Sequence, residues 1–161
     1  MNVLIIGYWD EKKAAAYKTE AESLGELLAK NNHSLISGGG IGVSKWVVNS
    51  YRLNNGKKYT AYFPSEEEMK KVDEKIGPFP DETIETAGTY TTRNECMIKD
   101  SDIIVALPGG IGTLGEIITA VKDYKKQVFV LDKGELASWI KNIQALYEKT
   151  IIVSELEKIF L

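Results

Sequence analysis

The sequence predicts a doubly wound α/β fold of the Rossmann type, with a mainly parallel sheet and helices on both faces. Short apolar segments alternate along the chain with longer segments of helical periodicity. Strands that are separated by helices pair in parallel. Two glycine-rich turns each follow an apolar strand and open a helix, as expected in such folds. No repeat or low-complexity stretch interrupts this pattern, so residues 1–161 are expected to form a single domain.

The pattern begins with a strand and a long helical segment. Asn2–Gly7 is apolar up to its closing glycine, which favours a buried strand. Asp10–Lys30 is predicted to be one helix, because Leu24 and Leu28 belong to an apolar stripe with helical spacing. The apolar segment Ser34–Ser37 is then the second strand.

The later segments continue the alternation. A helix is predicted over about residues 43–53, and Asn54–Gly56 ends it, because asparagine and glycine tolerate the left-handed conformation. Tyr59–Phe63 is the third strand. The remaining strands and helices are expected at Glu82–Ala87, Thr91–Lys99, Asp102–Leu107, Thr113–Tyr124, Gln127–Leu131, Glu135–Glu148 and Ile151–Val153, before a short amphipathic tail.

One connection, Pro64–Pro80, does not fit the alternation. Residues 65–75 within it are densely charged, which favours a solvated surface helix or loop. The other interpretation is a lid over the carboxyl ends of the strands, where ligands bind in doubly wound sheets. We favour the first interpretation from the sequence and keep the second open.

Composition excludes several classes of function. A net charge of −3 gives no electrostatic footprint for nucleic acid. A lone Cys96 and a lone His33 provide neither an internal disulfide nor a usual zinc site, and we assign them no chemistry. The N-terminus lacks a signal sequence and no apolar run reaches membrane-spanning length, so a cytoplasmic protein without membrane contact is expected.

The two glycine-rich turns carry the strongest functional signal. We expect them to bind a phosphorylated ligand through Gly38, Gly39, Gly40 and Gly42 of the first turn and Gly109, Gly110, Gly112 and Thr113 of the second. Backbone N–H groups at a helix N-terminus attract anions, most often phosphate. Because both turns follow parallel strands, they lie at the same edge of the sheet and face one ligand. Tight turn geometry alone is the structural alternative.

A dinucleotide site is the weaker interpretation of the second turn. Gly110, Gly112 and Gly115 satisfy the Gly-x-Gly-x-x-Gly pattern, and Asp132 follows at the distance of a ribose-binding acid. That fingerprint normally occupies the first strand–helix turn of its unit, and here the first turn is not glycine-rich. Neither turn contains the lysine of a P-loop.

Glu116 and Arg93 are the candidate catalytic residues. Glu116 follows the second turn by one helical turn, where a carboxylate would lie beside the group that carries the phosphate. Thr113–Glu116 also fits a capping box, in which Glu116 only caps the helix. Arg93 lies near the start of its helix, where a cation is not favoured by the helix dipole, so a role beyond helix stability is indicated. A solvated arginine is the alternative.

Pro108–Glu116 resembles the PGGxGTxxE motif of the LOG-like family, formerly called lysine decarboxylase-like. The resemblance extends over roughly residues 2–131 and implies a Rossmann-like fold, nucleotide phosphoribohydrolase activity, and catalytic roles for Glu116 and Arg93. This chain departs from the phosphoribohydrolases at Asn94, where they usually have lysine, and in a shorter first glycine turn. Both departures resemble the branch that contains molybdenum-cofactor carrier proteins.

Two functions are therefore carried forward. The first is an N-glycosidase that cleaves a nucleoside 5′-monophosphate into base and ribose 5-phosphate, with no metal or redox cofactor. In this reaction Glu116 stabilises positive charge on the ribose or orients water, and Arg93 positions the substrate or stabilises the departing base. The second is a non-catalytic carrier or sensor of a phosphorylated ligand, such as molybdenum cofactor or a nucleotide.

A homodimer or higher homo-oligomer is also expected, mainly because the family resemblance implies it. Trp46, Val48 and Tyr51 place large apolar side chains on one helix. They either form a single core-facing stripe or include a second strip for a symmetry mate. An interface through this helix, with the helix around Arg93 beside it, is the prediction.

Overall fold

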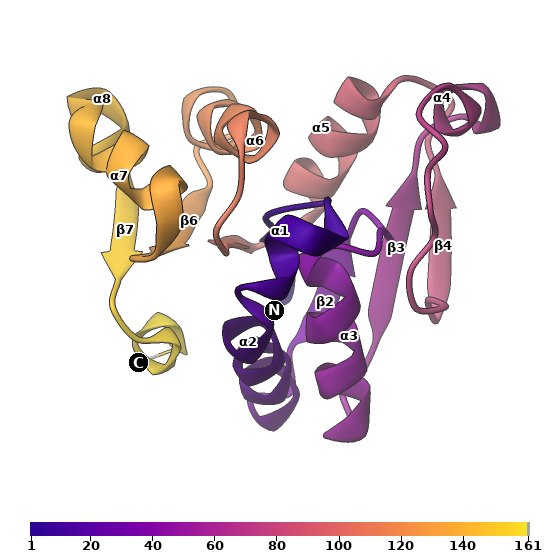
Figure 1. Ribbon diagram of the computed structural model, residues 1–161, viewed down its shortest axis with the longest axis horizontal. Helices are drawn as coiled ribbons and strands as arrows, with labels where there is room; N and C mark the ends of the chain where they lie inside the picture. The colour runs from indigo at the N-terminus through magenta and orange to yellow at the C-terminus, as the bar shows by residue number, and fades with distance from the viewer. Residues whose placement is uncertain (161) are drawn as a thin grey trace.

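A computed structural model of the protein describes residues 1–160 and confirms the predicted α/β fold (Figure 1). One seven-stranded sheet has the order β4-β3-β2-β1-β5-β6-β7, and all six of its strand pairings are parallel. The strands are β1 Asn2–Ile6, β2 Ser34–Ser37, β3 Tyr59–Phe63, β4 Glu82–Glu85, β5 Ile103–Ala106, β6 Gln127–Leu131 and β7 Thr150–Val153.

Helices cover both faces of the sheet, and each face has its own apolar core. Alternate residues of a strand point to opposite faces, so Val3 and Ile5 of β1 enter one core, while Leu4 and Ile6 enter the other. The first core is closed by α1 Glu11–Ala15, α2 Lys18–Lys30, α3 Val43–Leu53 and the 3₁₀ helix η1 Leu156–Phe160. The second core is closed by α5 Tyr90–Asp100, α6 Ile111–Lys122, α7 Gly134–Asn142 and α8 Gln144–Tyr147.

The helix predicted over Asp10–Lys30 is in fact two helices, α1 and α2. The break falls at Tyr17, whose backbone is not helical (φ −119°, ψ 22°). Its ring stacks on that of Tyr8, with the ring centroids 6.2 Å apart. This tertiary contact holds Tyr17 beside the loop that follows β1, and α2 begins in a new direction from there.

The helix predicted over Glu135–Glu148 is also interrupted. Ile143 is extended (ψ 93°) and separates α7 from α8. Both Ile140 and Leu146 are buried in the same core. Residues six apart do not share a face of a continuous helix, so the break is what allows both side chains to be buried.

The remaining differences from the predicted elements are small. β2, α3, β3 and β6 have the predicted bounds, and β4 ends at Glu85 rather than at Ala87. The charged connection contains a short helix, α4 Glu66–Lys71, none of whose residues is buried. Among residues 1–160, no helix combines the length and apolar character needed to span a membrane.

The strand order reverses between β1 and β5, and this reversal positions the site. β1 pairs with β2 on one side and with β5 on the other, and the chain leaves β1 and β5 toward opposite faces of the sheet. The loops at the carboxyl ends of these strands therefore separate and leave a crevice between them.

The packing of α2 against α3 yields a stability prediction for two glycines. A Cβ at Gly25 would lie 2.3 Å from the backbone oxygen of Val47, whereas a Cβ at Gly115 on α6 would meet nothing within 4 Å. We expect Gly25→Ala to lower the free energy of unfolding by about 1–3 kcal/mol through overpacking. We expect the control, Gly115→Ala, to raise it by up to about 1 kcal/mol through helix propensity. Urea denaturation measures both, and equal effects of the two substitutions would contradict the packing argument.

Candidate functional site

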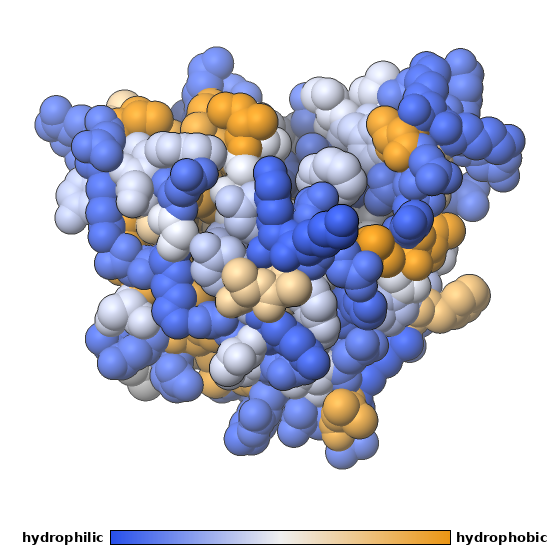
Figure 2. Space-filling model, viewed as in Figure 1, coloured by the Kyte–Doolittle hydropathy of each residue, from blue (hydrophilic) through white to orange (hydrophobic). Residues whose placement is uncertain are grey.

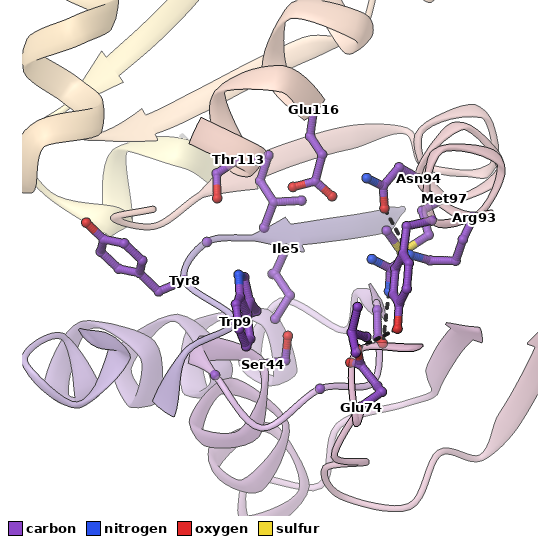
Figure 3. Close-up of a pocket in the computed structure, with 18 residues that line it drawn as sticks. Ile5, Tyr8, Trp9, Ser44, Glu74, Arg93, Asn94, Met97, Thr113 and Glu116 are labelled. Atoms are coloured by element: carbon purple, nitrogen blue, oxygen red, sulfur yellow. Dashed lines mark hydrogen bonds between the residues drawn. The ribbon is translucent and has the colours of Figure 1, made fainter. Parts of the chain in front are cut away.

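A cavity of about 410 Å³ lies at the crevice between the carboxyl ends of the central strands (Figure 3). Its walls come from the loops after β1 and β2 and from the first turns of α3, α5 and α6. Three helix N-termini therefore border the same space. Each carries unpaired N–H groups and a partial positive charge, so the cavity is suited to an anionic ligand.

The N-terminus of α6 is the most open of these three helix ends. Backbone hydrogen bonding of this helix begins at Leu114, whose N–H donates to the oxygen of Gly110 (3.1 Å). The preceding N–H groups, including those of Gly112 and Thr113 in the cavity wall, are left for a ligand. A Cβ at Gly112 would meet no protein atom within 4 Å, so this glycine leaves space on the cavity side.

The other two glycines of the second turn, Gly109 and Gly110, lie outside the cavity wall and shape the turn. A Cβ at Gly109 would lie 2.2 Å from the hydroxyl oxygen of Thr113, so the absence of a side chain at Gly109 allows Thr113 to pack there.

The glycines of the first turn also differ in whether they line the cavity. Gly38, Gly40 and Gly42 line the cavity, whereas Gly39 does not. Gly39 adopts the left-handed conformation (φ 71°) and packs against the ring of Phe63. A Cβ at Gly38 would lie 2.3 Å from the Nη1 atom of Arg93, so Gly38 leaves room for the guanidinium group.

Glu116 lines the cavity and does not form the capping box that was the alternative interpretation. The N-cap residue of α6 is Gly110, and Thr113 is already the third residue of the helix, so Thr113–Glu116 cannot cap it. The side chain of Glu116 instead points from α6 into the cavity, toward the side where Arg93 lies (Figure 3). Burial raises the pKa of the Glu116 carboxyl to about 7, although the positive charge of Arg93 acts to lower it.

Arg93 is held in the cavity wall by α5 and the first glycine turn. Its Nη1 atom donates to the oxygen of Gly38 (3.2 Å), and its Nε atom donates to Oδ1 of Asn94 (2.9 Å). The guanidinium group lies over the ring of Tyr90, 5.2 Å from the ring centroid. These two hydrogen bonds use two of the five N–H donors of an arginine, so the others are available to a ligand.

The structure brings together the two candidate catalytic residues and most of the predicted glycines, and it adds residues that sequence reasoning missed. Trp9, Ser44, Glu74 and Tyr90 also line the cavity. The only sequence signal for Glu74 was its place in the charged connection, which was favoured as a solvated segment. That interpretation holds for most of α4, which has no buried residue, but is wrong for Glu74, which reaches the site.

The residues to which the sequence analysis gave a weak functional role or none, Asp132, Gly115 and His33, do not line the cavity. Asp132 accepts a hydrogen bond from Lys141 (2.5 Å), and neither it nor Gly115 lines the cavity, which argues against the dinucleotide interpretation. His33 packs on Phe160, with ring centroids 4.7 Å apart. Within residues 1–160, no group of three or more metal-binding side chains is found.

The apolar residues of α3 belong to the core of the chain itself. Val48 and Tyr51 are fully buried, and Trp46 packs against the same core, so the core-facing interpretation of this helix is correct. These residues are therefore not available for the interface predicted through α3. A homodimer remains a prediction. On the face seen in Figure 2, the surface is largely hydrophilic, with apolar groups in separate small patches.

An open helix N-terminus, a partly buried arginine and a partly buried carboxylate at the strand-order reversal define a small-ligand site of a doubly wound α/β protein. The chain belongs to the SLOG cluster4 family, whose model matches residues 1–160.

Curated relatives share part of this chain. It is 32% identical over 111 residues to "Probable cytokinin riboside 5′-monophosphate phosphoribohydrolase LOGL9" of Oryza sativa subsp. japonica, over 68% of this chain and 46% of the rice protein. It is 28% identical over 107 residues to the cytokinin riboside 5′-monophosphate phosphoribohydrolase LOG1 of Arabidopsis thaliana, over 66% and 48% of the two chains. The chain thus spans about half the length of these plant relatives.

Solved structures confirm the fold. The molybdenum cofactor binding protein of Rippkaea orientalis superposes with a TM-score of 0.74 at 22% identity, over 96% of this chain and 88% of that one. The molybdenum cofactor carrier protein of Chlamydomonas reinhardtii superposes with a TM-score of 0.73 at 21% identity, over 96% and 90%.

The partly buried Glu116 yields a prediction on stability and pH. An ordinary glutamate has a pKa of 4.5, and that of folded Glu116 is raised to about 7. Above pH 7 the folded protein therefore holds a poorly solvated carboxylate, whereas below about pH 4.5 the group is protonated in both the folded and the unfolded chain. We expect Glu116→Gln to raise the free energy of unfolding at pH 8 by roughly 1–3 kcal/mol.

This gain is expected to shrink as the pH falls from 7 and to vanish below about pH 4.5. Chemical denaturation at a series of pH values measures it. Glu95→Gln, at an exposed position of α5, is the control and is expected to change little at any pH. A gain from Glu116→Gln that did not depend on pH would contradict the burial of a charged carboxylate.

Proposed function

We propose that this protein hydrolyses the N-glycosidic bond of a nucleoside 5′-monophosphate and releases the base and ribose 5-phosphate. The observation that carries the proposal is the position of Glu116: one helical turn beyond an open anion-binding helix end, inside the cavity, on the side of Arg93. The names of the plant relatives, which are nucleoside monophosphate phosphoribohydrolases, support it.

The phosphate is bound at the N-terminus of α6. The N–H groups of Gly112 and Thr113 and the Thr113 hydroxyl bind its oxygens, and the space beside Gly112 admits it. Gly109 and Gly110 shape this turn. The first glycine turn, through Gly38–Gly42, lets the sugar approach the backbone closely.

Glu116 and Arg93 then act on the ribose and the base. As the bond from C1′ to the base nitrogen breaks, positive charge develops on the ribose, and the Glu116 carboxylate stabilises it. Glu116 also accepts a proton from the attacking water, whose oxygen forms the new bond to C1′, and that proton passes to the departing base. A carboxyl with a pKa of about 7 is suited to both steps at neutral pH. The free N–H donors of Arg93 position the substrate.

The proposed reaction is tested by incubating the protein with AMP and other nucleoside monophosphates. We expect equal amounts of free base and ribose 5-phosphate to be released. We expect Glu116→Gln to reduce kcat by roughly 10²–10³-fold, since it removes the charge that stabilises the ribose. Glu95→Gln is the matched control and is expected to retain activity. No release above the Glu116→Gln background across the panel would refute the proposed reaction.

The phosphate position is tested by a second pair of variants. Gly112 and Gly115 both have open space where a Cβ would be, but only Gly112 lines the cavity. We expect Gly112→Ala to weaken AMP binding by at least about 10-fold, because its methyl group occupies the space for the phosphate. Gly115→Ala is expected to bind AMP normally. Isothermal titration calorimetry measures both, and equal affinities would contradict binding at this helix end.

A carrier or sensor of a phosphorylated ligand is the second candidate. Asn94 favours it: in the LOG-like phosphoribohydrolases this position usually carries a second cation, whereas here Asn94 accepts a hydrogen bond from Arg93. The two structural neighbours are named as binders of molybdenum cofactor. A ligand that is retained through purification and identified by mass spectrometry, together with absence of turnover, would favour this function over hydrolysis.

A further inference from the structure

Part of the charged connection, Val72–Gly77, is fastened onto the first glycine turn, and we call this segment the clamp. The N–H of Gly77 donates to the oxygen of Gly39 (2.7 Å), and Gly40 forms an isolated antiparallel bridge with Ile76. A Cβ at Gly77 would lie 2.3 Å from the oxygen of Gly40, so this close approach requires glycine. The clamp therefore has a defined register on the turn.

This register places Glu74 at the cavity. The N–H of Glu74 donates to the oxygen of Met69 (3.1 Å) at the end of α4, and the residue before it, Asp73, is left-handed (φ 49°). The chain thus turns sharply after α4 and directs the Glu74 carboxylate toward α5 (Figure 3). Glu74 lines both the main cavity and an adjoining cavity of about 310 Å³.

Tyr90 links the Glu74 carboxylate to Arg93, because it contacts both side chains. The hydroxyl of Tyr90 donates to Oε2 of Glu74 (2.7 Å), which fixes the phenol ring. The Arg93 guanidinium lies over that same ring, three residues further along α5. A cation over an aromatic face is held by the ring quadrupole, so the position of the ring decides where the cation is held.

We propose that Glu74 is a positioning residue: through its hydrogen bond with Tyr90, it sets the place and orientation of the Arg93 guanidinium that the ligand meets. The long arginine side chain has few other restraints, namely the carbonyl of Gly38 and the side chain of Asn94. Without an anchored Tyr90 ring, the guanidinium samples further rotamers and moves away from Glu116. The identity of the ligand and the kcat/KM measurements rest on the proposed function, whereas the titration of Glu116 does not.

The direction in which the pKa of Glu116 changes when Glu74 is removed distinguishes positioning of Arg93 from a direct effect of the Glu74 charge on Glu116. Arg93 lowers the pKa of Glu116. If Glu74 positions Arg93, its removal weakens this effect, and the pKa of Glu116 rises. If Glu74 acted on Glu116 only as a second negative charge, its removal would lower the pKa of Glu116. Arg93 and Tyr90 on α5 and Glu74 on the clamp are the charged and titratable groups in this wall of the cavity.

The experiment compares Glu74→Ala, Glu74→Gln, Tyr90→Phe and the double variant Glu74→Ala/Tyr90→Phe with the unmodified protein. Glu67→Ala is the control, because Glu67 lies on the preceding α4 with its side chain 83% exposed. Carboxyl carbon-13 NMR follows the titration of Glu116, and base release from AMP gives kcat/KM. Thermal unfolding shows which variants are folded, and Tyr90→Phe changes no residue of the clamp itself.

We expect the pKa of Glu116 to rise above its value of about 7 in Glu74→Ala and in Tyr90→Phe. We expect kcat/KM to fall by roughly 10–100-fold in each, as for a displaced positioning group. The kcat/KM of the double variant is expected to be no lower than that of the less active single variant, since both substitutions break the same contact. Glu74→Gln keeps an acceptor for Tyr90 and is expected to remain close to the unmodified protein.

An unchanged or lower pKa of Glu116 in the folded Glu74→Ala and Tyr90→Phe variants would overturn the inference. Additive losses in the double variant would also overturn it, because they would show that the two residues act separately. If the unmodified protein releases no base from AMP, the proposed reaction fails, but the titration of Glu116 still decides whether Glu74 positions Arg93.

Discussion

β1 is hydrogen-bonded to β2 along one side and to β5 along the other, with all three strands parallel. Parallel pairing places the carboxyl ends of these strands at one edge of the sheet, and the helices that follow all begin at that edge. Helix N-termini and their unpaired N–H groups are thereby concentrated around one crevice. The cavity, the glycine turns and the two candidate catalytic residues all depend on this arrangement of backbone.

The site is electrostatically balanced within a small space. Helix N-termini and Arg93 supply positive potential, and Glu116 and Glu74 supply two carboxylates around the same guanidinium group. Burial lowers the pKa of Arg93, while the two carboxylates act to raise it. Burial likewise raises the pKa of Glu116, while the charge of Arg93 acts to lower it, so each group favours the charged form of the other. A strongly shifted pKa in a cavity wall marks a candidate functional site.

Sequence periodicity was sufficient for most of the fold. α3, β3 and β6 have the predicted bounds, because their apolar patterns agree with the core into which they pack. The two long helices were predicted without their breaks at Tyr17 and Ile143. Those breaks arise from the Tyr8–Tyr17 stack and from burial of Leu146, which are contacts between segments and leave no local signal.

The candidate site was predictable only in part, for the same reason. Gly112, Thr113 and Glu116 lie within one local motif, whose glycines and spacing indicate a ligand site directly. The capping box that was the structural alternative for Thr113–Glu116 is not formed, because α6 begins at Ile111 and the capping position falls on Gly110. Glu74 was missed because its partners, Tyr90 and the first glycine turn, are far from it along the sequence.

The clamp also has a thermodynamic consequence. One isolated bridge, the backbone hydrogen bond from Gly77 to Gly39 and the side-chain hydrogen bond from Tyr90 to Glu74 hold it, so local unfolding of the clamp would break few contacts and would leave the sheet and both cores intact. A molecule with a detached clamp lacks the contact between Glu74 and Tyr90 that we assign to the positioning of Arg93. The apparent affinity for any ligand that contacts Arg93 is therefore the intrinsic affinity scaled by the fraction of molecules in which the clamp is attached. Such a ligand in turn stabilises the attached state, and this linkage couples occupancy of the cavity to the order of residues 72–77.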